Sequence, residues 1–262
     1  MFGSSSITWT FILYAVIGGL VPTVFWLWFW LQEDRKKPEP SRMIFKTFVV
    51  GGFFIIFAFF LEKFVAGNRD VLGGINSAIA NPNDYYPIFL ACLPLMAWAA
   101  IEEFLKFYAA RIAALRNVNF DEPVDAMIYM ITSALGFAAV ENFLFLLNSL
   151  VSSGNQNTFI FTGNLRFLGA TILHTVTSAI LGAFIGFSFY KSRTGKIIYF
   201  FIGLLMAIAL HTVFNFFIIT NEGNNIFPIL VALWVAAILI IFLFEIIKKV
   251  VRHKKVFTNT NP

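Results

Sequence analysis

Long apolar stretches, each able to cross a lipid bilayer as a helix, constrain the fold of this chain more than any other feature. Seven of them cover about residues 8–31, 44–66, 87–111, 124–150, 166–190, 197–220 and 226–247. A helix needs about 20 apolar residues to span the hydrocarbon. The connections between the stretches are short and polar, and no internal repeat is evident. We therefore predict an all-α polytopic membrane bundle of about seven transmembrane helices, forming a single integral-membrane domain over residues 1–262.

Composition excludes a soluble fold. Only 13% of the residues are charged and 59% are hydrophobic, whereas an average soluble domain is about 25% charged. The single cysteine, Cys92, excludes an internal disulfide. The net charge of +5 is concentrated in the connections and in a basic tail at 248–262, so it indicates membrane topology. The expected surroundings are a lipid bilayer, and no nucleic-acid partner is indicated.

The distribution of basic residues predicts the orientation of the bundle. The segments after the first, third, fifth and seventh stretches hold five, two, three and five Lys or Arg residues, whereas the other three segments hold one, one and none. Cytoplasmic connections are the ones enriched in Lys and Arg. The alternation supports seven spans, with the N-terminus outside and the C-terminus in the cytoplasm. In the cytoplasmic DEPVD segment, we expect Asp125 to pair with Arg111 or Arg116.

Several ionisable and amide side chains fall inside the apolar stretches, where a charge costs at least about 2.5–3.5 kcal/mol at the bilayer centre. Such residues are rare and usually functional. At 1.5 Å per residue, the two histidines and the most distant glutamate lie roughly 21–26 Å from the predicted cytoplasmic ends of their helices. If the third span continues towards Arg116, Glu102 lies at a similar depth, and four helices would then deliver carboxylates and imidazoles to one layer. The set comprises Glu102, Glu103, Lys106, Glu141, Asn142, His174, His211 and Asn215.

Spacing within the helices adds detail. Glu102 and Lys106 are four residues apart, so the ammonium group can reach the carboxylate. His211 and Asn215 have the same spacing and share one helix face, from which both could donate hydrogen bonds to an oxyanion. Glu103 points about 100° away from Glu102, so the two carboxylates need not have the same role.

Two carboxylates and two imidazoles indicate water as the nucleophile, and two mechanisms remain open. In the first, Glu141, His174 and His211 bind a zinc ion and Glu102 is the general base. In the second, no metal is present: Glu102 and His174 activate the water, while His211 and Asn215 stabilise the oxyanion. The chain lacks an HExxH motif, and sequence alone does not decide between the two mechanisms.

The same residues resemble the motifs of the PrsW family of intramembrane proteases, which is distantly related to the CAAX prenyl-protease and bacteriocin-processing superfamily. EEFLK at 102–106 matches EExxK, and the segment ending in Glu141 contains FxxxE. The histidine in RFLGATILHTVTSAILG follows, and HTVFN at 211–215 matches HxxxN. The four segments occur in order on successive stretches and cover roughly residues 85–220.

The resemblance implies hydrolysis of a peptide bond in a membrane-embedded, single-pass protein substrate, in some family members an anti-sigma factor. It implies a prokaryotic plasma membrane as the location. It also implies that Glu102 and Glu103 form the paired-glutamate motif, that Glu141 is the second acidic position, and that the two histidines are essential. Asn215 corresponds to the oxyanion-side asparagine of the wider superfamily. Lys106 departs from the superfamily, which often has Arg at a longer spacing.

Two other functions are compatible with the residues themselves. Chains of Glu and His also form the proton relays of ion-coupled or proton-coupled transporters. However, the sequence shows neither repeat halves nor paired interrupted helices. Activated water could equally attack a lipid amide or ester, so a membrane lipid hydrolase is the third interpretation.

Overall fold

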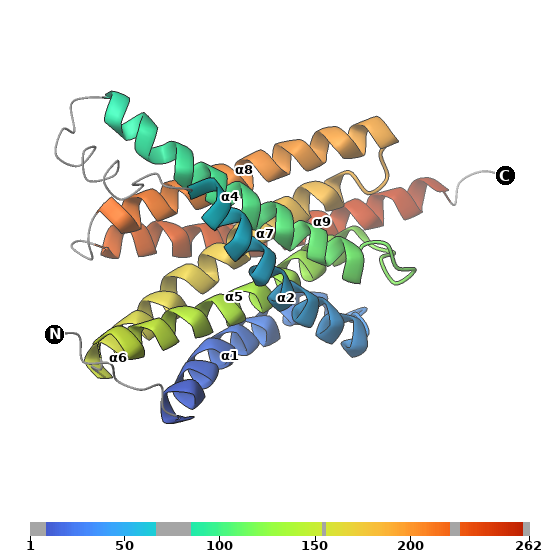
Figure 1. The fold of residues 1–262 in the computed structure, drawn as a ribbon. Helices are drawn as coiled ribbons and strands as arrows, with labels where there is room; N and C mark the ends of the chain where they lie inside the picture. The colour runs from blue at the N-terminus through green and yellow to red at the C-terminus, as the bar shows by residue number, and fades with distance from the viewer. Residues whose placement is uncertain (1–8, 67–84, 154–155, 221–225, 259–262) are drawn as a thin grey trace.

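The computed structural model describes residues 9–66, 85–153, 156–220 and 226–258, and all regular structure within these ranges is helical. The prediction of an all-α bundle is thereby confirmed. The elements, labelled as in Figure 1, are α1 (Trp9–Leu31), η1 (Gln32–Asp34), α2 (Ser41–Ala66), α4 (Tyr85–Ala113), α5 (Pro123–Ser153), α6 (Gln156–Leu165), η2 (Arg166–Ala170), α7 (Thr171–Phe187), α8 (Arg193–Thr220) and α9 (Phe227–Thr258).

Six segments are long and apolar enough to cross a membrane: α1 with η1, α2, α5, α6 through α7, α8 and α9. The 29-residue helix α4 has spanning length as well, about 43 Å at 1.5 Å per residue. Its C-terminal half carries the charged residues Glu102, Glu103 and Lys106. The chain is therefore a polytopic integral membrane protein, as predicted.

Helices α5 and α7 form the centre of the bundle, and the other helices surround them (Figure 1). The apolar windows of the α5 and α6–α7 spans are 67% and 72% buried, against 22–33% for the other four spans. The peripheral helices expose many large apolar side chains, among them Phe53, Phe60 and Phe201. Such surfaces are suited to contact with lipid chains, which accounts for the abundance of phenylalanine.

The start of the fifth span differs from the prediction. We expected it to begin at Arg166, but the helix continues back to Gln156 through α6 and the π-helical turn η2. The polar residues of QNTFIFTGNL suggested a connection between two spans. However, its apolar side chains Ile160 and Phe161 are exposed on the outer face of the helix, where lipid can cover them. Arg166 therefore lies within a helix.

The connection between α1 and α2 lies against the residues that immediately precede α5. Lys37 Nζ lies 2.7 Å from Asp121 Oδ1 and 3.3 Å from Glu122 Oε1, and the hydrogen bond to Asp121 raises the pKa of Lys37 above its usual value. The expected pairing of Asp125 with an arginine is wrong. Its Oδ2 accepts the backbone N–H groups of Asp121 and Glu122, at 3.0 and 2.7 Å. The carboxylate thus caps the start of α5.

Candidate active site

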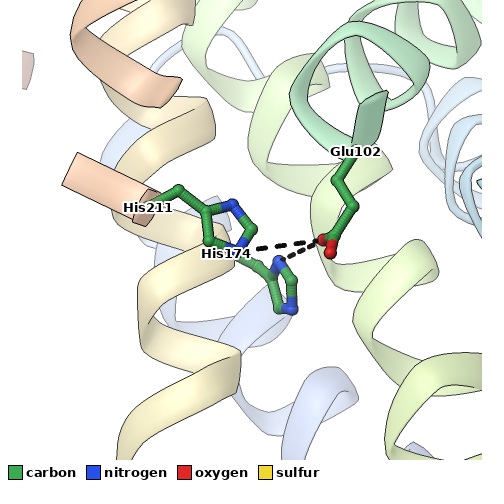
Figure 2. A group of neighbouring side chains, drawn as sticks. All are labelled: Glu102, His174 and His211. Atoms are coloured by element: carbon green, nitrogen blue, oxygen red, sulfur yellow. Dashed lines mark ion pairs between the residues drawn. The ribbon is translucent and has the colours of Figure 1, made fainter. Parts of the chain in front are cut away.

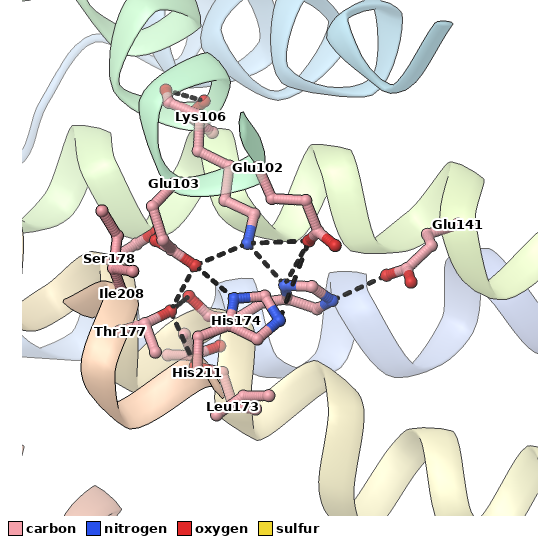
Figure 3. Close-up of polar contacts among 12 residues, drawn as sticks. Glu102, Glu103, Lys106, Glu141, Leu173, His174, Thr177, Ser178, Ile208 and His211 are labelled. Atoms are coloured by element: carbon pink, nitrogen blue, oxygen red, sulfur yellow. Dashed lines mark hydrogen bonds and ion pairs between the residues drawn. The ribbon is translucent and has the colours of Figure 1, made fainter. Parts of the chain in front are cut away.

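Four helices bring most of the predicted site residues into one buried cluster between α4, α5, α7 and α8 (Figure 3). Each helix contributes from its interior, as the depth of these residues in the apolar stretches predicted. Burial is nearly complete: Glu103 and Lys106 are 0% exposed, and the two histidines are each 2% exposed. The cluster comprises Glu102, Glu103 and Lys106 from α4, Glu141 from α5, His174 from α7 and His211 from α8.

Each histidine has one ring nitrogen against a carboxylate. His174 Nε2 lies 2.6 Å from Glu141 Oε2, and His211 Nδ1 lies 2.8 Å from Glu103 Oε1. An imidazole that donates one N–H to a carboxylate has its tautomer fixed and its other nitrogen available as an acceptor or ligand. The two glutamates therefore orient the two rings.

The remaining nitrogens converge on a third carboxylate (Figure 2). Glu102 Oε2 lies 3.7 Å from His174 Nδ1 and 4.0 Å from His211 Nε2. This oxygen is buried and has no hydrogen-bond partner among the described residues. An unsatisfied buried oxygen is costly, and a cation placed between the three groups would remove the cost.

The donor set fits a zinc ion. Two imidazole nitrogens and one carboxylate oxygen form the protein half of many catalytic zinc sites, with a fourth position open. One ligand atom from each of Glu102, His174 and His211 lies within 4.8 Å of the other two. Tetrahedral ligands about 2.1 Å from zinc would be ~3.4 Å apart, so the Glu102 oxygen would have to approach the two nitrogens, now at 3.7 and 4.0 Å, by about 0.3 and 0.6 Å. The set differs from the predicted one, because Glu141 contacts the far nitrogen of His174 and Glu102 takes its place.

Lys106 lies at the centre of the cluster. Its ammonium group is 2.6 Å from His174 Nδ1, 2.9 Å from Glu103 Oε1 and 3.4 Å from Glu102 Oε2. The predicted contact with Glu102 is present, but the closer carboxylate is Glu103. Because Lys106 bonds the nitrogen that would bind a metal, occupation of the site requires the ammonium to shift towards Glu103.

Glu103 accepts more hydrogen bonds than its neighbour Glu102. Besides Lys106 and His211, it accepts the hydroxyl groups of Thr177 at 3.0 Å and Ser178 at 3.5 Å. Such a fully bonded carboxylate has little freedom to take a proton or bind substrate. Its environment is that of a residue that positions His211 and Lys106.

Sequence reasoning missed Arg166, which it placed in an external connection. The guanidinium group lies 2.9 Å from Glu141 Oε2, bonds to the side-chain oxygen of Asn142 and lies 4.1 Å from the centre of the Phe145 ring. Arg166 lies in η2, and π-helical turns often occur at functional sites. The available signal was that Arg166 is the first residue of the stretch containing His174.

Charge balance supports a cation at this site. The three glutamates of the cluster face two cationic side chains, Lys106 and Arg166, which leaves one excess negative charge with both histidines neutral. A buried negative excess favours the binding of a cation.

The two asparagines lie at the margin of the cluster. Asn142 Nδ2 donates to Thr171 at 3.0 Å, joining α5 to α7. Asn215 lies one turn after His211 on α8 and is half-buried. Within the described part of the chain, no hydrogen bond joins Asn215 to the cluster. Its oxyanion role remains a prediction.

Comparison with known proteins identifies the family. The model of the PrsW family of intramembrane metalloproteases matches residues 39–245. The chain belongs to the PrsW family. Its relatives include the Protease PrsW of Bacillus subtilis (25% identical, covering 85% of this chain and 92% of that protein) and that of Clostridioides difficile (27%, 87% and 89%). No solved structure matches.

The resemblance seen in the sequence is thereby confirmed, and the chain is an intramembrane protease, hence a hydrolase. The matched range contains every residue of the cluster. The transporter interpretation is not supported by the family match. The name Protease PrsW belongs to bacterial relatives, which places this integral membrane protein in a bacterium.

Proposed function

We propose that this PrsW-family protein is a zinc-dependent endopeptidase of the bacterial plasma membrane that cleaves single-pass membrane proteins. Glu102, His174 and His211 would hold the ion. The observation that carries this proposal is the convergence of His174 Nδ1 and His211 Nε2 on Glu102 Oε2, an oxygen that accepts no hydrogen bond. Both rings are already oriented by carboxylates on their far sides, which is the usual outer arrangement of a histidine metal site.

When bound, zinc would lower the pKa of a water molecule and polarise the scissile carbonyl group. The protein's own groups then have separate roles. Glu141 and Glu103 hold the imidazoles in the ligand orientation. The ammonium of Lys106 is placed to stabilise negative charge developing on the carbonyl oxygen. The buried setting strengthens both effects, because electrostatic interactions are larger where water is excluded.

A metal-free mechanism is the alternative for the same site. Glu102, whose Oε2 has no hydrogen bond, would then accept the proton of the attacking water. A membrane-anchored anti-sigma factor is the substrate class that the family resemblance implies. Hydrolysis of a lipid amide or ester is the alternative reaction. Family membership favours the peptide bond.

The test combines metal analysis with a cleavage assay on purified protein and a synthetic transmembrane peptide. We expect about one zinc ion per chain, and we expect Glu102→Gln to lose both the metal and cleavage while keeping the unfolding temperature. The unfolding temperature should change little, because Oε2 accepts no hydrogen bond and its ion-pair partner Lys106 keeps the closer carboxylate of Glu103, at 2.9 Å. The matched control is Glu245→Gln, which removes an exposed carboxylate paired with Lys248.

Chelators and lipid substrates separate the alternatives. Full cleavage by zinc-free protein in the presence of a chelator would reject the metal and leave Glu102 as a base. Cleavage of a lipid ester but of no transmembrane peptide would reject the proposed substrate. Retained peptide cleavage by Glu102→Gln would reject the catalytic assignment in both mechanisms.

A further inference from the structure

A second group of carboxylates lies outside the active site, where the end of η1 and the α1–α2 connection meet the start of α5. One ligand oxygen from each of Asp34, Glu39 and Asp125 lies within 4.8 Å of the other two. Asp34 and Asp125 are only 7% and 1% exposed. Three carboxylates this close together repel one another strongly unless positive charge is shared between them.

Of the three carboxylates, Asp34 has the fewest contacts that stabilise its negative charge. Glu39 accepts the hydroxyl group of Tyr129, and Asp125 accepts two backbone N–H groups at the start of α5. Asp34, by contrast, lies at the carboxyl end of α1 and η1, where the helix dipole disfavours a negative charge. Its Oδ2 is buried and has no hydrogen-bond partner among the described residues.

The neighbouring lysines are bound elsewhere. Lys37 Nζ pairs with Asp121 and Glu122, and Lys248 Nζ lies 2.8 Å from both Glu33 and Glu245. Neither forms an ion pair with any of the three carboxylates in the described structure. Neither lysine therefore neutralises the group through a direct ion pair.

We propose that Asp34, Glu39 and Asp125 form a binding site for a hard divalent cation, Mg²⁺ or Ca²⁺, which is distinct from the active site. Carboxylate oxygens are the preferred ligands of these ions, with Ca²⁺ to oxygen distances of about 2.3–2.6 Å. Three oxygens 4.8 Å apart would each lie about 2.8 Å from an ion at their centre, so small side-chain movements would bring them to coordinating distance. The set contains no histidine or cysteine, so zinc and softer metals are not selected.

The surroundings permit entry and hydration of an ion. A cavity of about 500 Å³ lies between α1 and α2 and is lined by Asp34, Pro38, Glu39 and Ser41 at its polar end. Water molecules in this cavity would complete the coordination, which is the common arrangement for Mg²⁺. The ion would tie the end of α1 and the α1–α2 connection to α5, the helix that carries Glu141. Its expected effect is therefore on the packing of the bundle.

The test measures cation binding by the full-length protein in detergent. Thermal unfolding is followed by tryptophan fluorescence with Mg²⁺, Ca²⁺ or Mn²⁺ alone, and Mn²⁺ binding is titrated by electron paramagnetic resonance. We expect the unfolding temperature to rise by roughly 5–10 °C at ~100 times the dissociation constant. Asp34→Asn should lose the response and, without cations, unfold no earlier than wild type. Glu33→Gln is the matched control, one residue away but paired with Lys248.

Each other outcome counts against the site. No cation response in the wild type would overturn the proposal and leave the carboxylates sharing protons. A response that survives both Asp34→Asn and Glu39→Gln would place the ion elsewhere. A response lost in His174→Ala/His211→Ala would assign the ion to the active site. If Asp34→Asn does not fold, Glu39→Gln gives the same comparison.

Discussion

Glu141 forms a half-buried ion pair with Arg166, which lies in the turn that precedes α7. The guanidinium group of Arg166 lies 2.9 Å from its Oε2, and the same oxygen lies 2.6 Å from His174 Nε2. Arg166 also bonds to Asn142, the next residue on α5. The arginine therefore holds the carboxylate that in turn holds the imidazole. It touches neither Glu102 nor His211, so its role is that of a positioning residue.

We predict that Arg166→Gln lowers kcat by about 10–100-fold with little change in KM, because partners outside the metal ligands typically contribute on that scale. Arg166→Lys should recover part of the loss, since it keeps the charge but not the second hydrogen bond. The measurement is steady-state cleavage of a transmembrane peptide, with zinc content and unfolding temperature recorded for each variant.

Arg111→Gln is the control for this series, because Arg111 is exposed at the end of α4, lies over the Phe107 ring and forms no ion pair with any described residue. A fall in unfolding temperature without a fall in kcat would assign Arg166 a purely structural role. Equal activities for Arg166→Gln and Arg166→Lys would show that its charge is not used.

The cost of placing an ionisable group in an apolar helix explains which site residues could be recognised from the sequence. Glu102, His174 and His211 stand out because each interrupts a long apolar run, where an ionisable group is costly. Arg166 follows a polar run, so it looked like part of a connection. Its role depends on a π-helical turn and on a neighbour 25 residues earlier in the chain, neither of which has a periodic signature. The pairing of Glu102, rather than Glu141, with both histidines likewise depends on ring orientation.

At the level of elements, the contact of α2 with α5 depends on glycine. An added Cβ at Gly136 would lie 1.9 Å from the backbone oxygen of Phe48, and one at Gly51 would lie 2.2 Å from that of Ser133. Neither oxygen can move without shifting a helix. Small residues at such crossings let membrane helices approach closely. Because Ser133 Oγ also donates to the Lys106 carbonyl oxygen at 2.8 Å, this contact supports α4 as well.

We predict that Gly136→Ala destabilises the protein by about 1–3 kcal/mol, the usual cost of overpacking. The unfolding temperature should fall by several degrees. Gly163→Ala is the control, because a Cβ there meets only a Leu146 methyl group at 3.7 Å, an ordinary contact. Thermal unfolding in one detergent compares the two variants. Equal unfolding temperatures would mean that α2 and α5 pack less closely than described.

Most elements were predictable because their apolar runs are long and their connections polar, so helix boundaries were within a few residues. One exception is α6, whose mixed sequence is helical with its apolar side chains Ile160 and Phe161 exposed. The other is α9, which continues to Thr258 through residues that we predicted to form a basic tail after 247. The glycine contact was not predictable, since a glycine within an apolar helix does not indicate which partner approaches it.

For the whole molecule, the orientation in the membrane remains a prediction from charge. The α1–α2, α4–α5 and α7–α8 connections, together with the helix ends beside them, carry ten of the 19 Lys and Arg residues. The structure places Lys37 of the first connection beside Asp121 of the second. These connections therefore lie at one end of the bundle. We predict that this end faces the cytoplasm.

Cysteine labelling tests the orientation in intact cells after Cys92→Ala removes the native thiol. Ser152→Cys lies at the opposite end, on the exposed end of α5, and Ser192→Cys lies in the exposed α7–α8 connection. A membrane-impermeant maleimide should label Ser152→Cys directly, and it should label Ser192→Cys only after permeabilisation. The reverse pattern would show that the bundle has the opposite orientation. The carboxylates of the proposed cation site would then lie outside the cell, where they would meet extracellular ions.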